Sequence, residues 1–350
     1  MPPKFSSSKS LYYNDVNLLA SVSNYETVFS RSFVPNESYR IIVSPMQAII
    51  GPKFIEEAAK NNLSVFLPRD IDIARKLELF NLFYRYKVSE KQSCFYSLGI
   101  KDIDLELNSI SGHEIPFLGI DIANGYLNLA SVSNSISEYI NKNGIKQLRS
   151  LYVGNVHTGE GVAHLYGFFR SIAKNLFIRV GIGGGSPCST SDMTGVNRGN
   201  ITEIIDCKET ADIINKSKNQ EYATINILAD GGISKPAFGA KAFAAGADYI
   251  MLGGYFCDAE EAETNLNGDG SYWGGASEKQ LQLTNKIHKV SEGKVIQKVT
   301  NLKPLNKLVK DLWGGITSYV SYSGYSTLTD SIGNGYFEIK KNSLPPKNRV

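Results

Sequence analysis

The stretch VGIGGGSPCST, residues 180–190, is the part of this chain whose residue types point most directly to covalent chemistry. Four glycines precede Cys188, and Thr190 follows it two positions later. In a glycine-rich turn the backbone N–H groups can approach an anion closely, which favours the thiolate form of a nearby cysteine, and the thiolate is the nucleophile. A lone cysteine is more often a small buried hydrophobe, but of the four cysteines only Cys188 lies in such a loop. Cys188 is therefore the candidate nucleophile.

Three glycine turns are candidates for holding a phosphate group. They lie at Ser186, at Asp230-Gly231-Gly232 and at Gly253-Gly254, each after an apolar run. Glycine lets backbone N–H groups face an anion, although a single glycine turn more often serves only the chain reversal. Asp230 can accept hydrogen bonds from sugar hydroxyls, although alone it is more often a cap or turn residue. The three turns together predict a nucleotide site.

Eight short β-type runs alternate with segments in which apolar residues recur at helical spacing. The runs lie at 40–44, 63–67, 93–100, 116–122, 148–155, 177–183, 225–232 and 248–254. Helices are expected at 52–62, 134–144, 160–175, 208–220 and 235–246. This alternation predicts an α/β fold, a (β/α)8 TIM barrel whose active site lies at the C-terminal ends of the strands. An open doubly wound sheet is the main alternative, but the chain has no early GxGxxG with a downstream acid.

The barrel accounts for the chain as a single domain, 1–350. Residues 258–298 are polar and glycine-rich, which is typical of a lid, so we expect a mobile flap there. The stretch LNKLVKDLWGGITSYVSYSG, 305–324, predicts a helix, a break at its glycine pair and a second helix. Residues 340–350 predict a polar C-terminal tail.

Composition and charge narrow the range of partners. The chain has 350 residues, 42% of them hydrophobic and 20% charged, as expected of a folded globular protein. Its net charge of +3 is spread along the sequence, so we expect no nucleic-acid partner. No signal peptide is apparent and no segment approaches the roughly 20 apolar residues of a membrane span, so we expect a cytoplasmic protein without a membrane partner. The four histidines show no metal-ligand spacing, and we assign them no role.

Several motifs along the chain together resemble those of the IMP dehydrogenase and GMP reductase family. They follow one another in the family's order over nearly the whole chain. The family's fold is an eight-stranded barrel that binds a purine nucleotide across the strand ends, which agrees with the barrel expected from the residue pattern. The motifs are YNDVNLL (13–19), VSPMQAI (43–49), LGIDIANGY (118–126), YVGNVHTGE (152–160), VGIGGGSPCST (180–190), ILADGGISKPAFGAKAFAAGADYIMLGGYF (227–256), GGASE (274–278), SEGK (291–294) and WGGITSYVSYSG (313–324).

The resemblance implies a role for most residues of the predicted site. Cys188 would attack carbon 2 of the purine, and Asp230 would hold the ribose. The residues expected to bind the 5′-phosphate are Ser186, Gly232, Gly253, Gly254 and Tyr272. The backbone carbonyl groups of the cysteine loop would bind a monovalent cation such as potassium, and they include those of Gly183, Gly185 and Cys188.

Two reactions in the family share a covalent purine–cysteine intermediate, which one enzyme hydrolyses and the other reduces. Resemblance to the dehydrogenases would require a regulatory insert of roughly a hundred residues, for which this chain has no room. It would also require an Arg-Tyr pair in the flap, and this chain has no arginine between Arg198 and Arg349. DIANGY, LGG, ASE and SEGK resemble the reductases instead. The resemblance therefore implies NADPH-dependent reductive deamination of GMP to IMP and ammonia.

In this interpretation, further residues acquire roles by resemblance. Thr190 and Glu292 would assist the departure of ammonia, which needs a proton, and Arg69 would help the reducing step. Lys289 and Gly293 would contact the substrate. The NADPH nicotinamide is expected beside Asp121, Ala123, Asn124 and Gly125. Relatives also suggest a homotetramer.

The chain departs from the family pattern in two loops. Gly184 stands where relatives often have proline, and Pro45 and Gln47 replace an asparagine or alanine and an aspartate. These departures leave two alternatives open. One is an IMP dehydrogenase that lacks the regulatory insert, and the other is a catalytically silent purine-nucleotide-binding protein.

Overall fold

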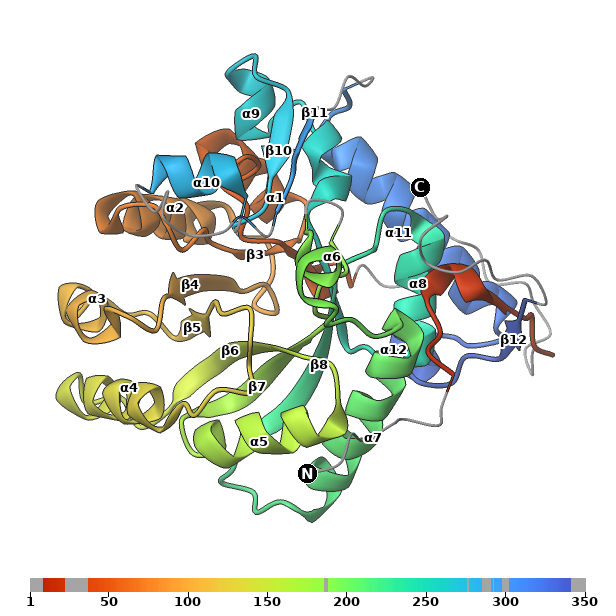
Figure 1. Cartoon of the computed structure of the whole chain (residues 1–350), viewed down its shortest axis with the longest axis horizontal. Coiled ribbons are helices and arrows are strands. Elements are labelled where there is room, and N and C mark those ends of the chain that lie inside the picture. The colour runs from red at the N-terminus through yellow and green to blue at the C-terminus, as the bar shows by residue number, and fades with distance from the viewer. Residues whose placement is uncertain are drawn as a thin grey trace.

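Eight parallel strands form a closed barrel in the computed structural model, which describes residues 9–22, 37–185, 188–275, 277–284, 291, 293–297 and 302–340 (Figure 1). Each strand pairs with the next along the chain, and the last pairs back with the first. This ring confirms the predicted TIM barrel and rules out the open sheet. Each of the eight predicted runs overlaps one strand. The strands are β2 (Ile41–Val43), β3 (Ser64–Phe66), β4 (Cys94–Leu98), β5 (Phe117–Ile120), β6 (Leu148–Val156), β7 (Ala173–Val180), β8 (Thr224–Asp230) and β9 (Tyr249–Leu252).

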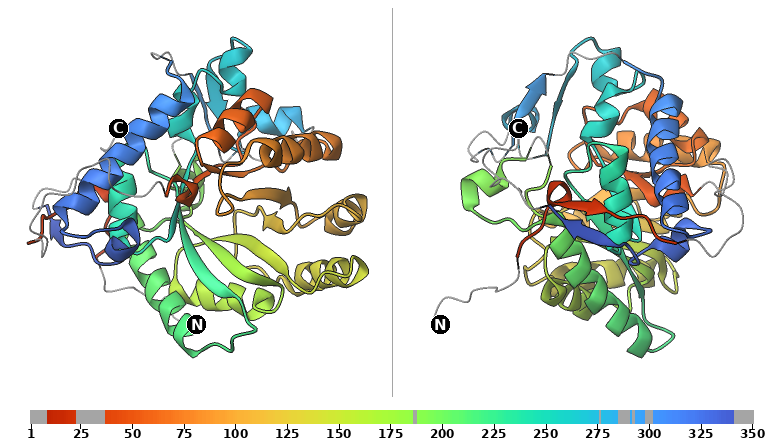
Figure 2. Two further views of the ribbon diagram at one scale, coloured as in Figure 1. Left: turned by 180° about the vertical axis from the view of Figure 1, so that it is seen from behind. Right: turned by 90° about the vertical axis from the view of Figure 1, so that its right-hand side faces the viewer.

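Helices follow the strands and cover the outside of the barrel (Figure 2). All five predicted helices are present. Among the described residues no helix is long and apolar enough to cross a membrane. The covering helices are α1 (Pro52–Lys60), α2 (Ile73–Tyr86), α3 (Ile103–Ser109), α4 (Ala130–Lys142), α5 (Gly159–Phe169), α7 (Asn200–Ser217), α8 (Pro236–Ala245) and α11 (Leu305–Tyr322).

Three sequence predictions about helices need correction. The helix expected over 208–220 is α7, which begins at Asn200 and ends at Ser217. The helix expected over 160–175 ends at Phe169, because pairing with β6 draws the following residues into β7, where Ala173 lies opposite Leu148. The break expected at the glycine pair of 305–324 does not occur, since α11 is continuous. A Cβ built on Gly315 would lie 2.3 Å from that of Pro236 at the start of α8. Glycine therefore lets two helices approach closely here and does not end one.

The barrel interior is filled by one side chain from each strand, mostly aromatic. Phe66 on β3 and Tyr152 on β6 pack together with ring centroids 4.2 Å apart and ring planes inclined by 34°. Gly119 on β5 makes room for this pair, because a Cβ built there would lie 2.0 Å from the Phe66 ring. The barrel is thus a packed core, and a ligand can enter only at its ends. The interior side chains are Ile42, Phe66, Phe95, Phe117, Tyr152, Phe177, Leu228 and Met251.

Smaller elements extend the barrel at two places. Near the chain ends, β1 (Val16–Leu18) pairs antiparallel with β12 (Phe337–Ile339), and the two strands are seen side by side in the right panel of Figure 2. The predicted flap, 258–298, contains a hairpin of β10 (Ser271–Trp273) and β11 (Val295–Gln297). Its described part also holds two short helices. The remaining elements are η1 (Tyr13–Asp15), η2 (Ser38–Arg40), α6 (Thr190–Thr194), η3 (Gly254–Asp258), α9 (Glu263–Leu266), α10 (Glu278–Leu283) and α12 (Leu328–Ser331).

The predicted mobility of the flap stays a prediction. Of the tail predicted at 340–350, Lys340 is described and residues 341–350 lie outside the described part of the chain.

We predict that Gly119→Ala destabilises the fold by about 1–3 kcal/mol, because its methyl group overlaps the Phe66 ring. Gly167→Ala is the matched control, because this exposed glycine in α5 has no atom within 4 Å of a built Cβ. There alanine should stabilise the protein by about 0.5–1 kcal/mol. Urea denaturation of both variants measures the two free energies. Equal stability of the two variants would contradict the interior packing described above.

Candidate active site

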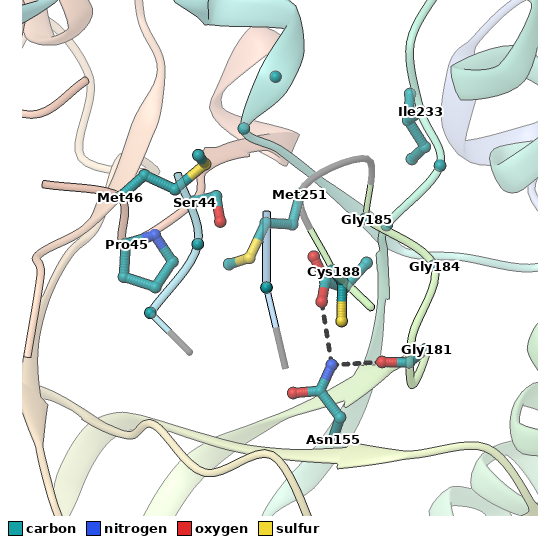
Figure 3. Close-up of a pocket in the computed structure, with 18 of the residues that line it drawn as sticks. Ser44, Pro45, Met46, Asn155, Gly181, Gly184, Gly185, Cys188, Ile233 and Met251 are labelled. Carbon is teal, nitrogen blue, oxygen red and sulfur yellow. Dashed lines mark hydrogen bonds between the residues drawn. The ribbon is translucent and has the colours of Figure 1, made fainter. Parts of the chain in front are cut away.

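A pocket of about 640 Å³ opens at the C-terminal ends of the barrel strands. The loops after six of the eight strands contribute to it, β6 adds Asn155 from within the strand, and the β10–β11 hairpin covers part of it. Figure 3 shows Cys188, Met251 and Asn155 facing the same space. The sequence-predicted residues that line the pocket are Arg69, Asp121, Ala123, Gly183, Gly185, Cys188, Thr190, Asp230, Gly232, Gly253, Gly254, Tyr272 and Gly293.

The cysteine loop places a half-buried thiol at the wall of this pocket. The Cys188 N–H donates to Gly185 O at 2.9 Å, which closes a tight turn. Its Sγ lies 3.2 Å from Oγ1 of Thr190, at the start of α6. Its backbone also forms an antiparallel bridge with Gly293 from the hairpin region. The other three cysteines are buried, so Cys188 is the thiol that a ligand can reach.

The other glycine turns form the floor of the pocket by close backbone approach. Gly231 and Gly232 have φ of +88° and +75°, which side-chain-bearing residues rarely adopt. A Cβ on Gly231 would lie 2.8 Å from the backbone of Gly184 in the cysteine loop. A Cβ on Gly254 would lie 3.4 Å from the hydroxyl oxygen of Tyr272. The predicted phosphate ligands that the structure describes therefore come from the loop after β8, the loop after β9 and strand β10.

Charged side chains that also line the pocket form one connected network. Arg179 on β7 donates from Nε to Asp230 Oδ2 at 2.7 Å and from its NH1 group to Asp121 Oδ1 at 3.0 Å. Asn155 donates to the same Asp230 oxygen at 2.9 Å. Burial opposes the charge of Arg179, but the attraction of Asp230 and other neighbours outweighs it and raises its pKa. The network therefore fixes one carboxylate oxygen of Asp230.

Arg69 connects the same network to the side of the pocket after β3. It donates to the backbone oxygen of Asp121 at 2.7 Å and to Asp70 Oδ2 at 3.0 Å. Burial lowers the pKa of Arg69, but the nearby carboxylates of Asp121 and Asp70 outweigh burial, so its pKa is raised. Arg69 is thus a positive charge at the pocket wall that Asp70 and Asp121 hold in place.

Two predicted cofactor residues do not line the pocket. Asn124 is exposed, and its Oδ1 accepts a hydrogen bond from the Tyr126 N–H. Gly125 is buried, and its N–H donates to Asn155 O at 2.8 Å. A Cβ on Gly125 would collide with that same oxygen, so close packing explains why glycine stands at this position. The predicted residues Ser186, Lys289 and Glu292 lie outside the described residues.

Sequence reasoning missed the polar side chains inside the strand runs. Arg179 and Asn155 each interrupt an apolar run, and such an interruption is the signal that could have found them. Lys303 also lines the pocket, as do Ser44 and Met46 from the loop after β2. Asn155, Ser44 and Met46 lie within motifs of the resemblance, but the sequence analysis assigned none of them a role.

A buried acid lies behind the cysteine loop. Glu203 of α7 is 1% exposed, and Asn200 donates to its Oε1 at 3.4 Å. Its Oε1 lies 3.5 Å from a Cβ built on Gly181, a residue of the pocket wall. Burial, with a smaller contribution from Asp230, raises the pKa of Glu203 to about 8. The carboxyl group is therefore largely protonated at neutral pH.

Comparison with protein families matches residues 91–343 to the IMP dehydrogenase / GMP reductase domain. The chain belongs to this family. It is 27% identical to the GMP reductase of Onchocerca volvulus over 321 residues, which cover 87% of this chain and 81% of that protein. It is also 30% identical to the GMP reductases of Caenorhabditis elegans and Enterobacter sp. (strain 638), over 251 and 246 residues. These two alignments cover 67% of this chain and 63% and 65% of the relatives, less than two thirds of their length.

We predict that Arg179→Met destabilises this family member by about 3–5 kcal/mol, because it leaves Asp121 and Asp230 close together without their shared cation. Arg198→Met is the control, since it breaks a more exposed pair with Asp206 and should cost about 1 kcal/mol or less. Chemical denaturation gives both values. Equal losses in the two variants would contradict the importance of the network.

The protonated Glu203 predicts a pH dependence of stability. Because its folded-state pKa of about 8 exceeds the ordinary value of 4.5, its stabilising contribution is complete below pH 4.5 and is lost as the pH rises through 8. Between pH 5 and pH 9 the parent should lose about 2–4 kcal/mol more than Glu203→Gln. Glu209→Gln, on the exposed face of the same helix, should behave like the parent. Parallel pH profiles for the parent and Glu203→Gln would show that the carboxyl group is already ionised.

Proposed function

We propose that this protein catalyses the NADPH-dependent reductive deamination of GMP to IMP and ammonia through a covalent cysteine–purine intermediate. The observation that carries the proposal is the half-buried Cys188 beside Thr190, in a pocket that also gathers Asp230 and the glycine turns. Membership of the family and the similarity to three proteins named GMP reductase support this choice of reaction.

The first step forms a bond between Cys188 Sγ and carbon 2 of the purine, and breaks the bond from that carbon to the amino nitrogen. The nitrogen leaves as ammonia after it has taken up a proton. NADPH, held beside Arg69, Asp121 and Ala123, would supply the hydride that carbon 2 needs, and cleavage of the carbon–sulfur bond would then restore the Cys188 thiolate. Overall GMP, NADPH and two protons give IMP, NADP⁺ and an ammonium ion, so atoms and charge balance.

We propose that the Thr190 hydroxyl group passes a proton to the leaving nitrogen. Its hydroxyl oxygen is 3.2 Å from the sulfur, so a proton held there is next to the reacting carbon. Gly293, the residue after the proposed partner Glu292, lies opposite Cys188 in a backbone bridge. This bridge supports placing the SEGK motif beside the sulfur.

The substrate is proposed to lie with its phosphate on the glycine floor. Backbone groups of Gly232, Gly253 and Gly254 and the hydroxyl group of Tyr272 would supply neutral donors there, with Ser186 as a further proposed phosphate contact. Lys289 is proposed to contact the purine base. Asp230 would hold the ribose. Both of its side-chain bonds within the described part of the chain use Oδ2, which leaves Oδ1 to accept from sugar hydroxyls.

The cofactor is proposed to enter beside Arg69, Asp121 and Ala123, which line the pocket on the side of β3 and β5. The residues fit a nicotinamide group, because Arg69 is held in place by Asp70 and Asp121 and can offer hydrogen bonds without moving. Asn124 and Gly125 remain proposed only as neighbours of this region.

A potassium ion is proposed to be held by backbone carbonyl groups of the cysteine loop. Carbonyl oxygens are suitable donors for potassium, and Gly185 O keeps a second lone pair beyond its bond to Cys188 N–H. Gly183 and Cys188 complete the proposed set. Among the described residues no cluster of three His, Cys, Asp or Glu side chains could hold a metal ion. The proposed enzyme is a homotetramer, as the resemblance implies, and we propose a cytoplasmic location from the sequence pattern.

The main alternative is an IMP dehydrogenase without the regulatory insert, because the matching family model includes both activities. That reaction needs a group that activates water, and no arginine lies between Arg198 and Arg349 to serve in the flap. A silent nucleotide-binding protein is the second alternative. The reductase interpretation is preferred because the listed motifs and the three named relatives agree.

The test is to mix the purified protein with NADPH and each purine monophosphate and to follow the loss of absorbance of the reduced nicotinamide. GMP should be consumed with formation of IMP and ammonia. Cys188→Ala should lower kcat by roughly a thousandfold or more while GMP affinity stays within about threefold. Cys94→Ala, a buried cysteine, is the control and should retain catalysis. Formation of XMP and NADH from IMP and NAD⁺ would establish the dehydrogenase. If none of the nucleotides is turned over, the silent nucleotide-binding protein is favoured.

A further inference from the structure

A buried glutamine joins the hairpin region to the barrel. Gln280 of α10 is 5% exposed and lies between two side chains. Its Oε1 accepts a hydrogen bond from Trp273 Nε1 at 3.0 Å, and its Nε2 donates to Gln47 Oε1 at 3.2 Å. Trp273 ends β10, and Gln47 lies in the loop between β2 and α1. The three side chains therefore form a relay from the hairpin to the barrel.

The direction of this relay is fixed by chemistry. The Trp273 indole is a donor only, so Gln280 must turn its oxygen toward it and its NH2 group toward Gln47. Gln47 must then turn its side-chain oxygen toward the Gln280 NH2 group to accept that hydrogen bond. Trp273 is 7% exposed, and a buried donor or acceptor left without a partner costs about 1–3 kcal/mol. No other arrangement of the same three groups satisfies all of them.

Both ends of the relay are next to pocket residues. Tyr272, beside Trp273 in β10, lines the pocket at Gly254, and Met46, beside Gln47, lines it from the loop after β2. A cavity of about 20 Å³ lies against Gln47, Trp273 and Gln280, and it shares residues with the main pocket. The relay is thus one layer behind the proposed ligand site.

The same glutamine is tied to the cysteine loop through its own helix. Ser277 caps α10 and accepts from the Gln280 N–H at 3.3 Å. Ser277 also forms a backbone bridge with Gly293, which in turn bridges to Cys188. A shift of Gln280 would therefore disturb the contacts of both Tyr272 and the cysteine loop.

We propose that Gln280 is a positioning residue, which with Gln47 holds residues 271–283 over the pocket in the arrangement that binds nucleotide. This inference rests on the proposed function, because it assigns the relay to the binding of GMP at that site. Gln280 touches no reacting atom. Its loss should weaken binding more than it slows the chemical step, so KM should rise and kcat should change little.

The experiment compares Gln280→Leu and Gln47→Leu with Gln282→Leu, a matched control on the exposed face of the same helix. Both relay variants should raise the KM for GMP roughly tenfold and lower kcat less than threefold. The control Gln282→Leu should keep the KM and kcat of the parent. Gln47→Glu keeps an oxygen that can accept from Gln280, so it should restore KM to within about twofold of the parent.

A second readout does not depend on turnover. Trp313→Phe removes the only other tryptophan, so the emission of Trp273 alone can be followed. In this background Gln280→Leu should shift the emission to longer wavelength, as expected when a buried indole becomes exposed, and should weaken GMP binding by the same factor as KM. If Gln280→Leu does not fold, Gln47→Leu tests the same relay from the half-buried barrel side.

An unchanged KM and unchanged Trp273 emission in both leucine variants would overturn the proposal, as would a fall in kcat with KM constant. A lower melting temperature with unaltered GMP binding would do the same, because it would show a structural role only. If the parent binds GMP but never oxidises NADPH, the proposed reaction is refuted. The relay stays supported if Gln280→Leu still weakens GMP binding and shifts the Trp273 emission in the Trp313→Phe background.

Discussion

Arg179 lies between two carboxylates at the C-terminal ends of the barrel strands, and the shape of the pocket depends on this interaction. The cation reaches Asp230 at the end of β8 and Asp121 after β5, and Asp121 in turn holds Arg69 through its backbone oxygen. Charges removed from water need partners with good geometry, and here each has at least one. The orientation of Asp230, which we propose to bind ribose, follows from this network.

Glycine allows the loops of the pocket to meet. The backbone of Gly231 approaches that of Gly184 so closely that a side chain at the first position would overlap the cysteine loop. The same closeness brings backbone donors from the loops after β7, β8 and β9 around one space. A neutral floor of this kind can receive a phosphate group without a lysine or arginine at every contact.

The region after β9 is more ordered in its described part than its composition indicates. The polar, glycine-rich sequence predicted a flap, and the structure places a hairpin and two short helices in its described part, with Ser277, Gln280 and Trp273 buried. Tyr272 and Trp273 belong to the main hydrophobic core, and the Gln47 relay adds directional hydrogen bonds to that packing. The segment is therefore held over the pocket by apolar burial and by hydrogen bonds together.

The sequence by itself determined the eight strands, most of the helices around them and the cysteine loop, because these depend on local periodicity and on glycine patterns. The family resemblance added candidate ligands, most of which the structure brings to one pocket. Tertiary structure alone decided that Arg179 joins residues 58 and 51 positions away, that Gly315 packs against Pro236, and that Gln280 reaches Gln47. Such contacts are set by how distant segments meet when the barrel closes, and no spacing along the chain encodes them.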